Sequence, residues 1–173
     1  MFSIYRCCDA SIKDSKKTAN HQQRILQAEL GLKGNPLRYF KIDLISEIKR
    51  LKRKFGDNLR PYILGDFNND RRIEQIISDI CHEFKLVDIY SYLNPNAPDF
   101  KTYMRGSTRI DRGLIPKIVA DKMKHHAEQN ATTPTVYYES FFYRFCGDHR
   151  ALVIDIPINI MFGTWETSPF DSR

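Results

Sequence analysis

Two stretches of the chain carry hydrophobic residues at helical spacing. From Phe40 to Phe55, apolar residues recur every three or four positions, and the opposite face is rich in lysine and arginine. Arg71 to Phe84 repeats the pattern with four isoleucines. Each stretch therefore predicts an amphipathic helix that packs one face on a core. A weaker stripe predicts a third helix over His21 to Leu30.

Short apolar runs between turn residues predict the strands. Pro61 to Leu64 is apolar with a β-branched residue, and we expect it to be a strand that is buried on both faces and stopped by Gly65. Phe2 to Cys7 alternates in part and predicts an opening strand. Two more strands are predicted, at Thr108 to Ile115, closed by Pro116, and at Ala151 to Ile158.

In other segments the pattern does not decide between helix, strand and loop. Leu86 to Tyr90 fits a short strand or a turn, Ile118 to His126 is ambiguous, and Tyr137 to Phe145 is aromatic without a clear period. Ala127 to Thr135 is polar and predicts a loop. Strands alternate with helices up to about residue 90 and strands follow, which predicts an α/β fold with a mixed sheet.

Composition narrows the class of protein. The 173 residues, 42% of them hydrophobic, suffice for one domain with a real core. A net charge of +6 and a pI near 9.1 favour a polyanionic partner, with nucleic acid first. The basic face of the Phe40 to Phe55 helix fits a solvated surface better than a phosphate-contacting patch.

Location and redox state follow from what the sequence does not carry. No apolar run approaches the roughly 20 residues of a membrane span, and the first residues do not fit a signal peptide. The four cysteines show neither a CxxC pair nor a disulfide spacing, and no zinc-ligand spacing surrounds Cys81-His82 or His125-His126. We expect reduced thiols in an intracellular protein, cytoplasmic or nuclear, with no membrane attachment.

Three polar clusters adjoin the predicted strands. Asp66 and Asn68 follow one strand, and a period of two would place both side chains on the same side of the chain. The other two clusters are Asp111 within a strand and Asp148-His149 before the last strand. Each has a plainer interpretation, namely a cap of the next helix, a salt bridge to a neighbouring arginine, and an ordinary turn.

Taken together, these clusters resemble a known family. Gly-Asp-Phe-Asn at 65–68, Arg-Ile-Asp at 109–111 and Gly-Asp-His at 147–149 are similar in order and spacing to the endonuclease/exonuclease/phosphatase superfamily. This superfamily includes apurinic endonucleases, deoxyribonuclease I, inositol-phosphate phosphatases and retrotransposon endonuclease domains, which the chain resembles most. The resemblance covers residues 1–160, leaves 161–173 as a tail, and implies the C-terminal portion of a DNase I-like α/β sandwich, with a mixed, mostly antiparallel sheet and flanking helices.

The resemblance implies a role for each matched residue. Asp66 would orient or deprotonate the attacking water, and Asn68 would hold the scissile phosphate. His149 would contact a phosphate oxygen, while Asp111 would hydrogen-bond its other ring nitrogen and keep it charged. The types suit phosphodiester cleavage, which needs charge neutralised on the phosphate oxygens and an in-line nucleophile.

The remaining implied roles concern the metal and the substrate. Asp148 would sit beside a divalent ion, Mg²⁺ or Mn²⁺, because such ions accept hard carboxylate oxygens. Tyr5 would touch the phosphate as a catalytic residue, with Arg6 beside it in substrate binding. The implied substrate is DNA, and in a parent element a reverse transcriptase would follow the domain.

One feature departs from the family pattern. In the family, the chain ahead of the Tyr5 strand supplies an asparagine and the main metal-binding glutamate, whereas here no acidic residue precedes Tyr5. We therefore expect an N-terminally truncated domain with an unpaired sheet edge and an uncovered apolar face. Two alternatives stay open, an inactive fragment that binds nucleic acid through its basic surface and a phosphatase of phosphoinositides or other small phosphoesters.

Overall fold

The structure, a computed structural model, describes residues 2–5, 24–25, 27–34, 36–56, 59–68, 71–98, 100–141 and 147–162. Helices and strands both contribute, so the predicted α/β class is confirmed. The strands are β1 (Phe2–Tyr5), β2 (Ile63–Asp66), β3 (Leu86–Asp88), β4 (Asp111–Pro116), β5 (Val136–Tyr138) and β6 (Leu152–Ile154). The labelled helices are α2 (Pro36–Phe55), α3 (Arg71–Phe84), α4 (Ile89–Leu93), α5 (Lys117–Gln129) and α6 (Ile158–Phe162).

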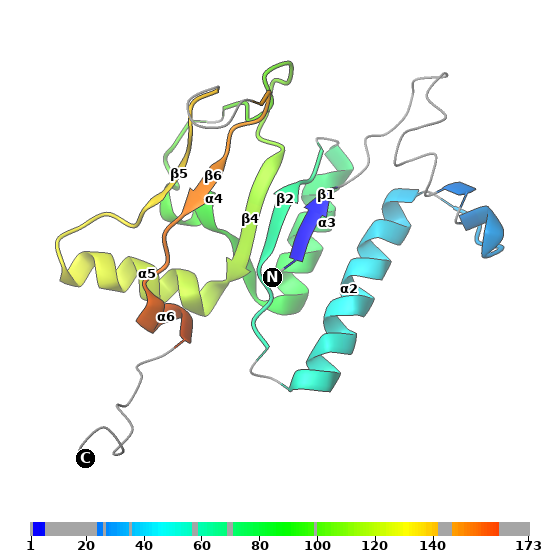
Figure 1. The fold of residues 1–173 in the computed structure, drawn as a ribbon, viewed down its shortest axis with the longest axis horizontal. Coiled ribbons are helices and arrows are strands. Elements are labelled where there is room, and N and C mark those ends of the chain that lie inside the picture. Colours follow the sequence, from blue (N-terminus) through cyan, green and yellow to red (C-terminus); the bar gives the residue numbers. More distant parts are fainter. Residues whose placement is uncertain are drawn as a thin grey trace, which may run out of the picture.

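The main sheet has four strands in the order β1-β2-β4-β3 (Figure 1). β1 runs parallel to β2, whereas β4 is antiparallel to both β2 and β3. β5 and β6 form a separate antiparallel pair. The sheet is therefore mixed and mostly antiparallel with flanking helices, as predicted.

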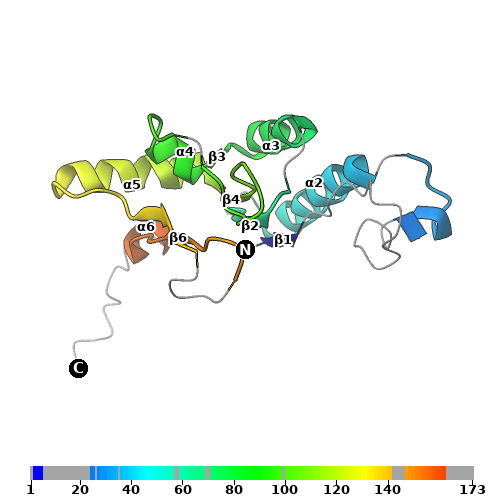
Figure 2. The same ribbon diagram turned by 90° about the horizontal axis from the view of Figure 1, so that it is seen from above.

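Helices α2 and α3 cover one face of this sheet, where the larger hydrophobic cluster lies (Figure 2). Ile48 of α2, Ile63 of β2, Ile80 of α3 and Leu114 of β4 are each fully buried in this cluster. Both helices were predicted from their apolar stripes. α2 begins at Pro36, four residues before the predicted start, because proline is favoured in the first turn of a helix.

The opposite face of β4 carries a second hydrophobic cluster. Ile115 points into it beside Val119 and Met123 of α5, and Leu152 and Ile154 of β6 pack against the same cluster. Leu114 and Ile115 thus face opposite sides, as successive residues of a strand do. β4 is the strand on which the two clusters meet.

The bulk of β6 explains a glycine in β4. A Cβ atom added at Gly113 would lie 2.9 Å from the Leu152 side chain and 3.0 Å from that of Ile154. These distances are too short for carbon contacts, so with any larger residue the Leu152 and Ile154 side chains would have to shift. Glycine at 113 lets β6 approach, and β6 directly follows the segment that carries His149.

The structure corrects the prediction for β2. Gly65 does not stop the strand, since β2 runs from Ile63 to Asp66 through Gly65 at a φ of 151°. Glycine reaches this backbone region without the steric cost that other residues meet. The strand is also not buried on both faces, because Leu64 and Gly65 are only partly buried. The correction places Asp66 inside the strand ladder.

Other boundaries shift as well. The predicted strand at Thr108 to Ile115 begins only at Asp111, because the backbone N–H groups of residues 110 and 111 bond to a threonine side chain instead. The ambiguous segment Ile118 to His126 belongs to α5, whose end at Gln129 makes the first part of the predicted loop helical. The predicted strand at Ala151 to Ile158 is shorter, and α6 crosses the predicted domain boundary at residue 160.

Three basic residues of α2 are paired with nearby carboxylates. For the three paired residues, the ion pairs support the interpretation as a solvated surface over that as a phosphate-contacting patch. The pairs are Lys41 with Asp79, Lys49 with Glu83, and Arg50 with Glu47.

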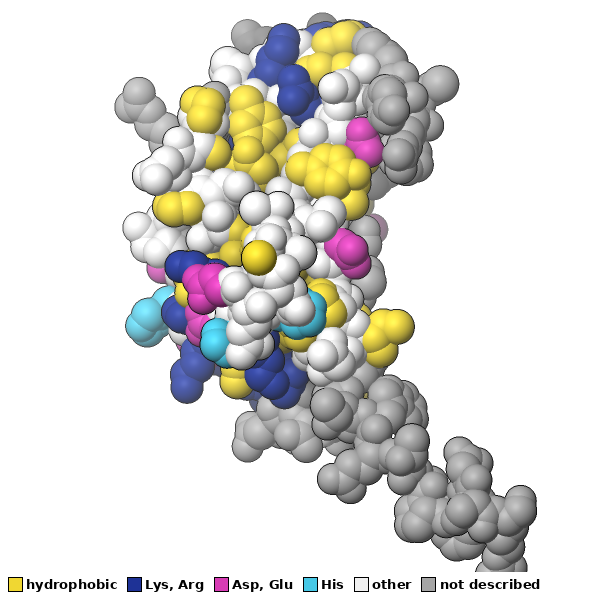
Figure 3. All heavy atoms as spheres, turned by 90° about the vertical axis from the view of Figure 1, so that its left-hand side faces the viewer, with side chains coloured by type: hydrophobic (Ala, Val, Ile, Leu, Met, Phe, Trp, Pro, Cys, Tyr) yellow, Lys and Arg dark blue, Asp and Glu magenta, His cyan; other side chains and the backbone are white. Residues whose placement is uncertain are grey.

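The surface on the α5 and β5 side is divided in character (Figure 3). Charged side chains of both signs and histidines gather over its lower part, larger hydrophobic side chains lie above them, and further Lys or Arg side chains lie near the top. None of the helices in the described part of the chain is long and apolar enough to cross a lipid bilayer.

Candidate active site

Three of the predicted side chains meet at one end of the main sheet. Asp66 is the last residue of β2, Asp111 is the first residue of β4, and the two are direct partners in the antiparallel ladder. His149 lies just ahead of β6. Metal-binding atoms of Asp66, Asp111 and His149 all lie within 4.8 Å of one another. Strand pairing thus brings together residues that are 45 and 38 positions apart in sequence.

The imidazole of His149 is paired with the carboxylate of Asp111. Its Nδ1 lies 3.0 Å from Oδ2 and 3.2 Å from Oδ1 of Asp111. Burial by itself lowers the pKa of His149, but the hydrogen bond to Asp111 and the charges of Asp111, Asp66 and Asp148 outweigh it, so the pKa is raised. The side chain is 37% exposed, so Nε2 of a charged His149 can meet an anion from solvent.

Asp111 is held by two side chains that the sequence did not single out. Thr102 is fully buried, and its Oγ1 accepts hydrogen bonds from the backbone N–H groups of Ile110 and Asp111, both at 3.0 Å. The hydroxyl of Tyr138 donates to the backbone carbonyl of Asp111 at 2.5 Å. Burial raises the pKa of Tyr138 to about 12, which keeps this hydroxyl a donor at neutral pH.

His149 is positioned by the strand-like segment that carries Thr102. The ring of Tyr103 lies 4.8 Å from the ring of His149 at an interplanar angle of 32°, and the two residues form a backbone bridge. Met104 donates its backbone N–H to Asp148, and Arg150 donates to Thr102, both at 2.7 Å. In the sequence, Phe100, Thr102 and Met104 alternate with Lys101 and Tyr103, and this strand-like alternation is the local signal for the segment.

The arginines beside Asp111 do not pair with it. Arg109 lies 2.9 Å from Oδ2 of Asp88, and Arg112 lies 3.2 Å from the same oxygen. Arg112 also contacts Glu74. The plainer interpretation of Asp111, a salt bridge to its neighbours, is therefore not what the structure has. Asp88 occupies both arginines, and Asp111 faces His149.

Asp66 is buried, with 8% of its surface exposed, and its carboxylate accepts the backbone N–H of Asn68 at 2.7 Å. Asn68 has a left-handed φ of 46°, so the period of two ends at Asp66 and does not fix where the Asn68 side chain points. Asp66 lies five residues before Arg71, the start of α3, so it is not that helix's N-cap. Residues 69 and 70 lie outside the described part.

The other predicted site residues are placed only in part. The carboxylate of Asp148 is not in the cluster of Asp66, Asp111 and His149, although its charge helps to raise the pKa of His149. The backbone of Tyr5 pairs with Asp66, which puts β1 next to the site. The side chain of Tyr5 and all of Arg6 lie outside the described residues.

The donor set of the cluster fits a hard divalent cation. Two carboxylates face one another across β2 and β4, and His149 pairs with that of Asp111. Carboxylate oxygens are the ligands that Mg²⁺ and Mn²⁺ prefer. A charged His149 would not ligate a metal, so the fit is to an ion held by Asp66 and Asp111 while His149 faces the substrate.

Comparison with known proteins adds no relative to this picture. No protein-family model matches the chain, and no curated protein matches it. The function is therefore argued from the residues and geometry of the site itself.

Proposed function

We propose that this chain carries the active site of a divalent-metal-dependent phosphodiesterase of the endonuclease type that acts on DNA. It would be the C-terminal portion of a DNase I-like domain of the endonuclease/exonuclease/phosphatase superfamily. The observation that carries the proposal is the meeting of Asp66, Asp111 and His149 at one sheet end.

His149 is suited to hold a phosphate oxygen. Its Nδ1 is occupied by Asp111, which leaves Nε2 as the free donor of the ring. The positive charge that Asp111 supports would be placed where negative charge develops on the phosphate. Thr102 and Tyr138 fix Asp111, so the donor is oriented before substrate arrives.

Asp66 is suited to accept the proton of an attacking water. Its carboxylate is buried and is oriented by the N–H of Asn68, so its position is fixed before water or substrate arrives. The proposed role of Asn68 is to bind the scissile phosphate through its amide. Tyr5 and Arg6 would contribute to phosphate binding from β1 and the segment after it.

The proposed cofactor is Mg²⁺ or Mn²⁺, held by Asp66 and Asp111 with Asp148 nearby. When bound, such an ion supplies Lewis acidity and neutralises phosphate charge. The paired carboxylates of Asp66 and Asp111 are the residues that would bring this positive charge to the site.

DNA is favoured over a small phosphoester because of the charge of the chain. A net charge of +6 supports binding to a polyanionic backbone. A phosphoinositide or other small phosphoester would be handled by the same catalytic residues, and the substrate test below separates the two.

The experiment is nicking of supercoiled plasmid by the purified chain, with Mg²⁺ and with a chelator. We expect nicking that depends on the metal and that falls by about 10² to 10³ in rate in His149→Ala, since a pre-oriented donor is lost. His125→Ala is the matched control, because His125 is an exposed residue of α5 far from the site in sequence and fold.

Two outcomes would contradict the proposal. One is nicking that persists at the same rate in His149→Ala, and the other is a folded chain that releases phosphate from small phosphoesters but never nicks DNA. A chain that binds DNA in a salt-sensitive way, indifferent to Mg²⁺, would support the alternative of a binding module, which the charge of +6 also favours.

A further inference from the structure

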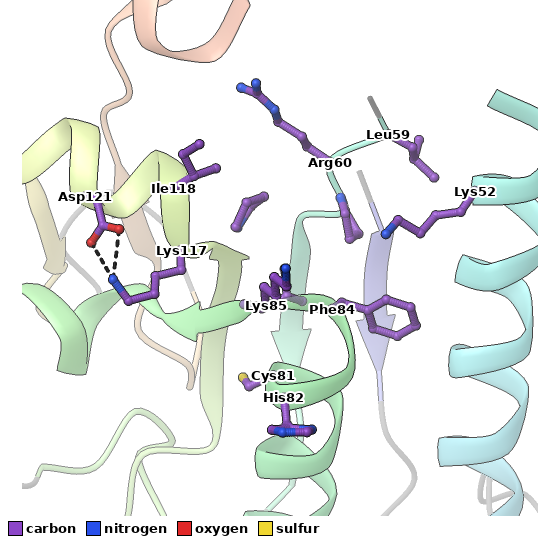
Figure 4. A pocket seen from close by; sticks show the side chains of 13 residues that line it. Lys52, Leu59, Arg60, Cys81, His82, Phe84, Lys85, Lys117, Ile118 and Asp121 are labelled. Carbon is purple, nitrogen blue, oxygen red and sulfur yellow. Dashed lines mark hydrogen bonds and ion pairs between the residues drawn. The ribbon is translucent and has the colours of Figure 1, made fainter. Parts of the chain in front are cut away.

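A large pocket lies at the opposite end of the main sheet from the candidate active site (Figure 4). It has a volume of about 850 Å³ and is formed by α2, the segment before β2, the end of α3, and the junction of β4 with α5. Small-molecule sites typically have volumes of about 300 to 1,000 Å³. Asp111 begins β4 and Pro116 ends it, so the pocket and the active site are about 17 Å apart along this strand.

Cationic side chains line the pocket in excess over acidic ones. Lys52, Arg60, Lys85 and Lys117 line it, with Asp121 as the single carboxylate. Lys117 turns away to bind Asp121 at 2.8 Å, whereas Lys52 reaches in from α2 (Figure 4). Within the described part of the chain, the side chains of Lys52, Arg60 and Lys85 have no hydrogen bond and no ion pair.

The backbone at Lys85 is in an unusual conformation. Lys85 follows the last residue of α3 and has a left-handed φ of 54°, a position usually taken by glycine or asparagine. Its carbonyl accepts the backbone N–H of Lys117 at 2.9 Å, which ties the end of α3 to the start of α5. A lysine at this costly position puts an unpaired cation at the pocket.

Apart from His82, the rest of the lining is apolar. Phe84, Leu86 and Pro116 form buried walls, and Ile118 is 53% exposed at the edge. Burial raises the pKa of Cys81, which also lines the pocket, to about 11, so its thiol is protonated and acts as an apolar group. An apolar cavity with unpaired cations suits a ligand that has a flat apolar body and an anionic end.

We propose that this pocket binds a nucleoside 5′-phosphate, either free or at the end of a DNA strand. The base would lie against Phe84, Pro116 and Ile118, and the phosphate would meet Lys52 and Lys85. The side chain of Arg60 extends away from the two lysines (Figure 4) and would turn towards the phosphate on binding. An arginine and two lysines are common phosphate partners, with the guanidinium able to bind two oxygens at once. The inference is independent of the proposed hydrolysis, because no residue is shared between the two sites.

The test is calorimetric titration of the chain with dAMP in the presence of chelator. Deoxyadenosine lacks the phosphate of dAMP, and inorganic phosphate lacks its nucleoside, so each serves as a half-ligand. A short single strand with a 5′-phosphate distinguishes binding of a strand end from binding of a free nucleotide. We expect saturable binding of dAMP, and binding at least about tenfold weaker for each half-ligand, because each loses one set of contacts.

Variants assign the binding to the pocket. The triple variant Lys52→Gln, Arg60→Gln, Lys85→Gln should weaken dAMP binding at least about tenfold, whereas a triple variant with the same charge change outside the pocket should not. That control is Lys101→Gln, Lys122→Gln, Lys124→Gln. Ile118→Gln should weaken binding of dAMP but not of inorganic phosphate.

Three results would overturn the proposal. They are the absence of saturable dAMP binding by a folded chain, equal affinity for dAMP and inorganic phosphate, and dAMP binding that the pocket variant leaves unchanged. Loss of plasmid nicking in His149→Ala bears only on the hydrolytic site, so the failure of one proposal is distinguishable from the failure of the other.

Discussion

The two ends of the main sheet treat charge in opposite ways. At the end where β4 begins, the carboxylates of Asp111 and Asp88 are paired, with Asp111 bound to His149 and Asp88 bound to two arginines. At the end where β4 stops, Lys52, Arg60 and Lys85 face a pocket without an ion-pair partner in the described residues. Ion pairs hold side chains in a fixed geometry, which a catalytic site requires. Cations without an ion-pair partner are available to bind an anionic ligand.

The difference also has an energetic side. The pair of Arg109 and Asp88 is largely buried, with side chains 8% and 11% exposed, so each charge depends on the other. The cations of the pocket are solvated, and their mutual repulsion is screened by water and salt. Substitutions at the two ends should therefore affect stability very differently.

Asp88→Asn should destabilise the protein strongly. It leaves Arg109 buried without a counter-charge, and such a loss costs about 3 to 5 kcal/mol in the free energy of unfolding. Denaturant-induced unfolding followed by circular dichroism measures the change. Asp121→Asn is the control, since it breaks an exposed pair at the pocket and should cost less than about 1 kcal/mol. Equal losses in the two variants would contradict the proposed contrast.

Lys85→Gly should stabilise the protein by about 1 kcal/mol, because glycine adopts the left-handed conformation at this position without steric cost. The same change at Lys122, an exposed residue within α5, should destabilise by about 1 kcal/mol, since glycine is a poor helix former. Thermal unfolding of the two variants measures the expected gain and the expected loss of stability. A loss of stability in Lys85→Gly would mean that Lys85 makes contacts that the structure does not show.

Asp111→Asn should lower the pKa of His149. Burial alone lowers this pKa, and the hydrogen bond and charge of Asp111 raise it above the ordinary value of 6.5, so removing the charge removes the main opposing effect. Titration of the histidine ring signals by NMR, in chelator, measures the shift. Asp155→Asn, at an exposed carboxylate after β6, should leave the pKa unchanged.

The raised pKa also sets a pH dependence of stability. Because the pKa of His149 is higher in the folded state, the paired cation stabilises the fold fully below pH 6.5, and this contribution is lost as pH rises through the folded pKa. Asp111→Asn should therefore remove part of the stability that the protein has at low pH. An unchanged pH profile in this variant would argue against the charged pair.

Much of the fold could be predicted because its signals are local. The helix from Arg71 to Phe84 was predicted at both ends, since its isoleucines and phenylalanine mark one continuous face. α5 was ambiguous because Ile118, a large apolar residue of its first turn, lies on the pocket side and not in the core stripe. Gly65 misled the prediction, because a glycine that continues a strand looks like one that ends it.

The site was only partly predictable, for a related reason. Asp66, Asp111 and His149 adjoin strands in the sequence, and strand order brings them together. Thr102 and Tyr138 act on the backbone of Asp111 from distant segments, with no motif to mark them. Likewise, the sequence places Arg109 and Arg112 on either side of Asp111, but both arginines pair with Asp88, which lies at the junction of β3 and α4.

The central claim is that the end of β2 and the start of β4 form a hydrolytic site. It is tested most directly by the initial rate of Mg²⁺-dependent plasmid nicking by Asp66→Asn, which keeps the acceptor for Asn68 but removes the carboxylate charge. We predict a loss of about 10² or more in rate, since a water-activating base is removed, and an unchanged rate in Asp155→Asn. A rate for Asp66→Asn equal to that of the unaltered chain would contradict the assignment of this sheet end as the active site.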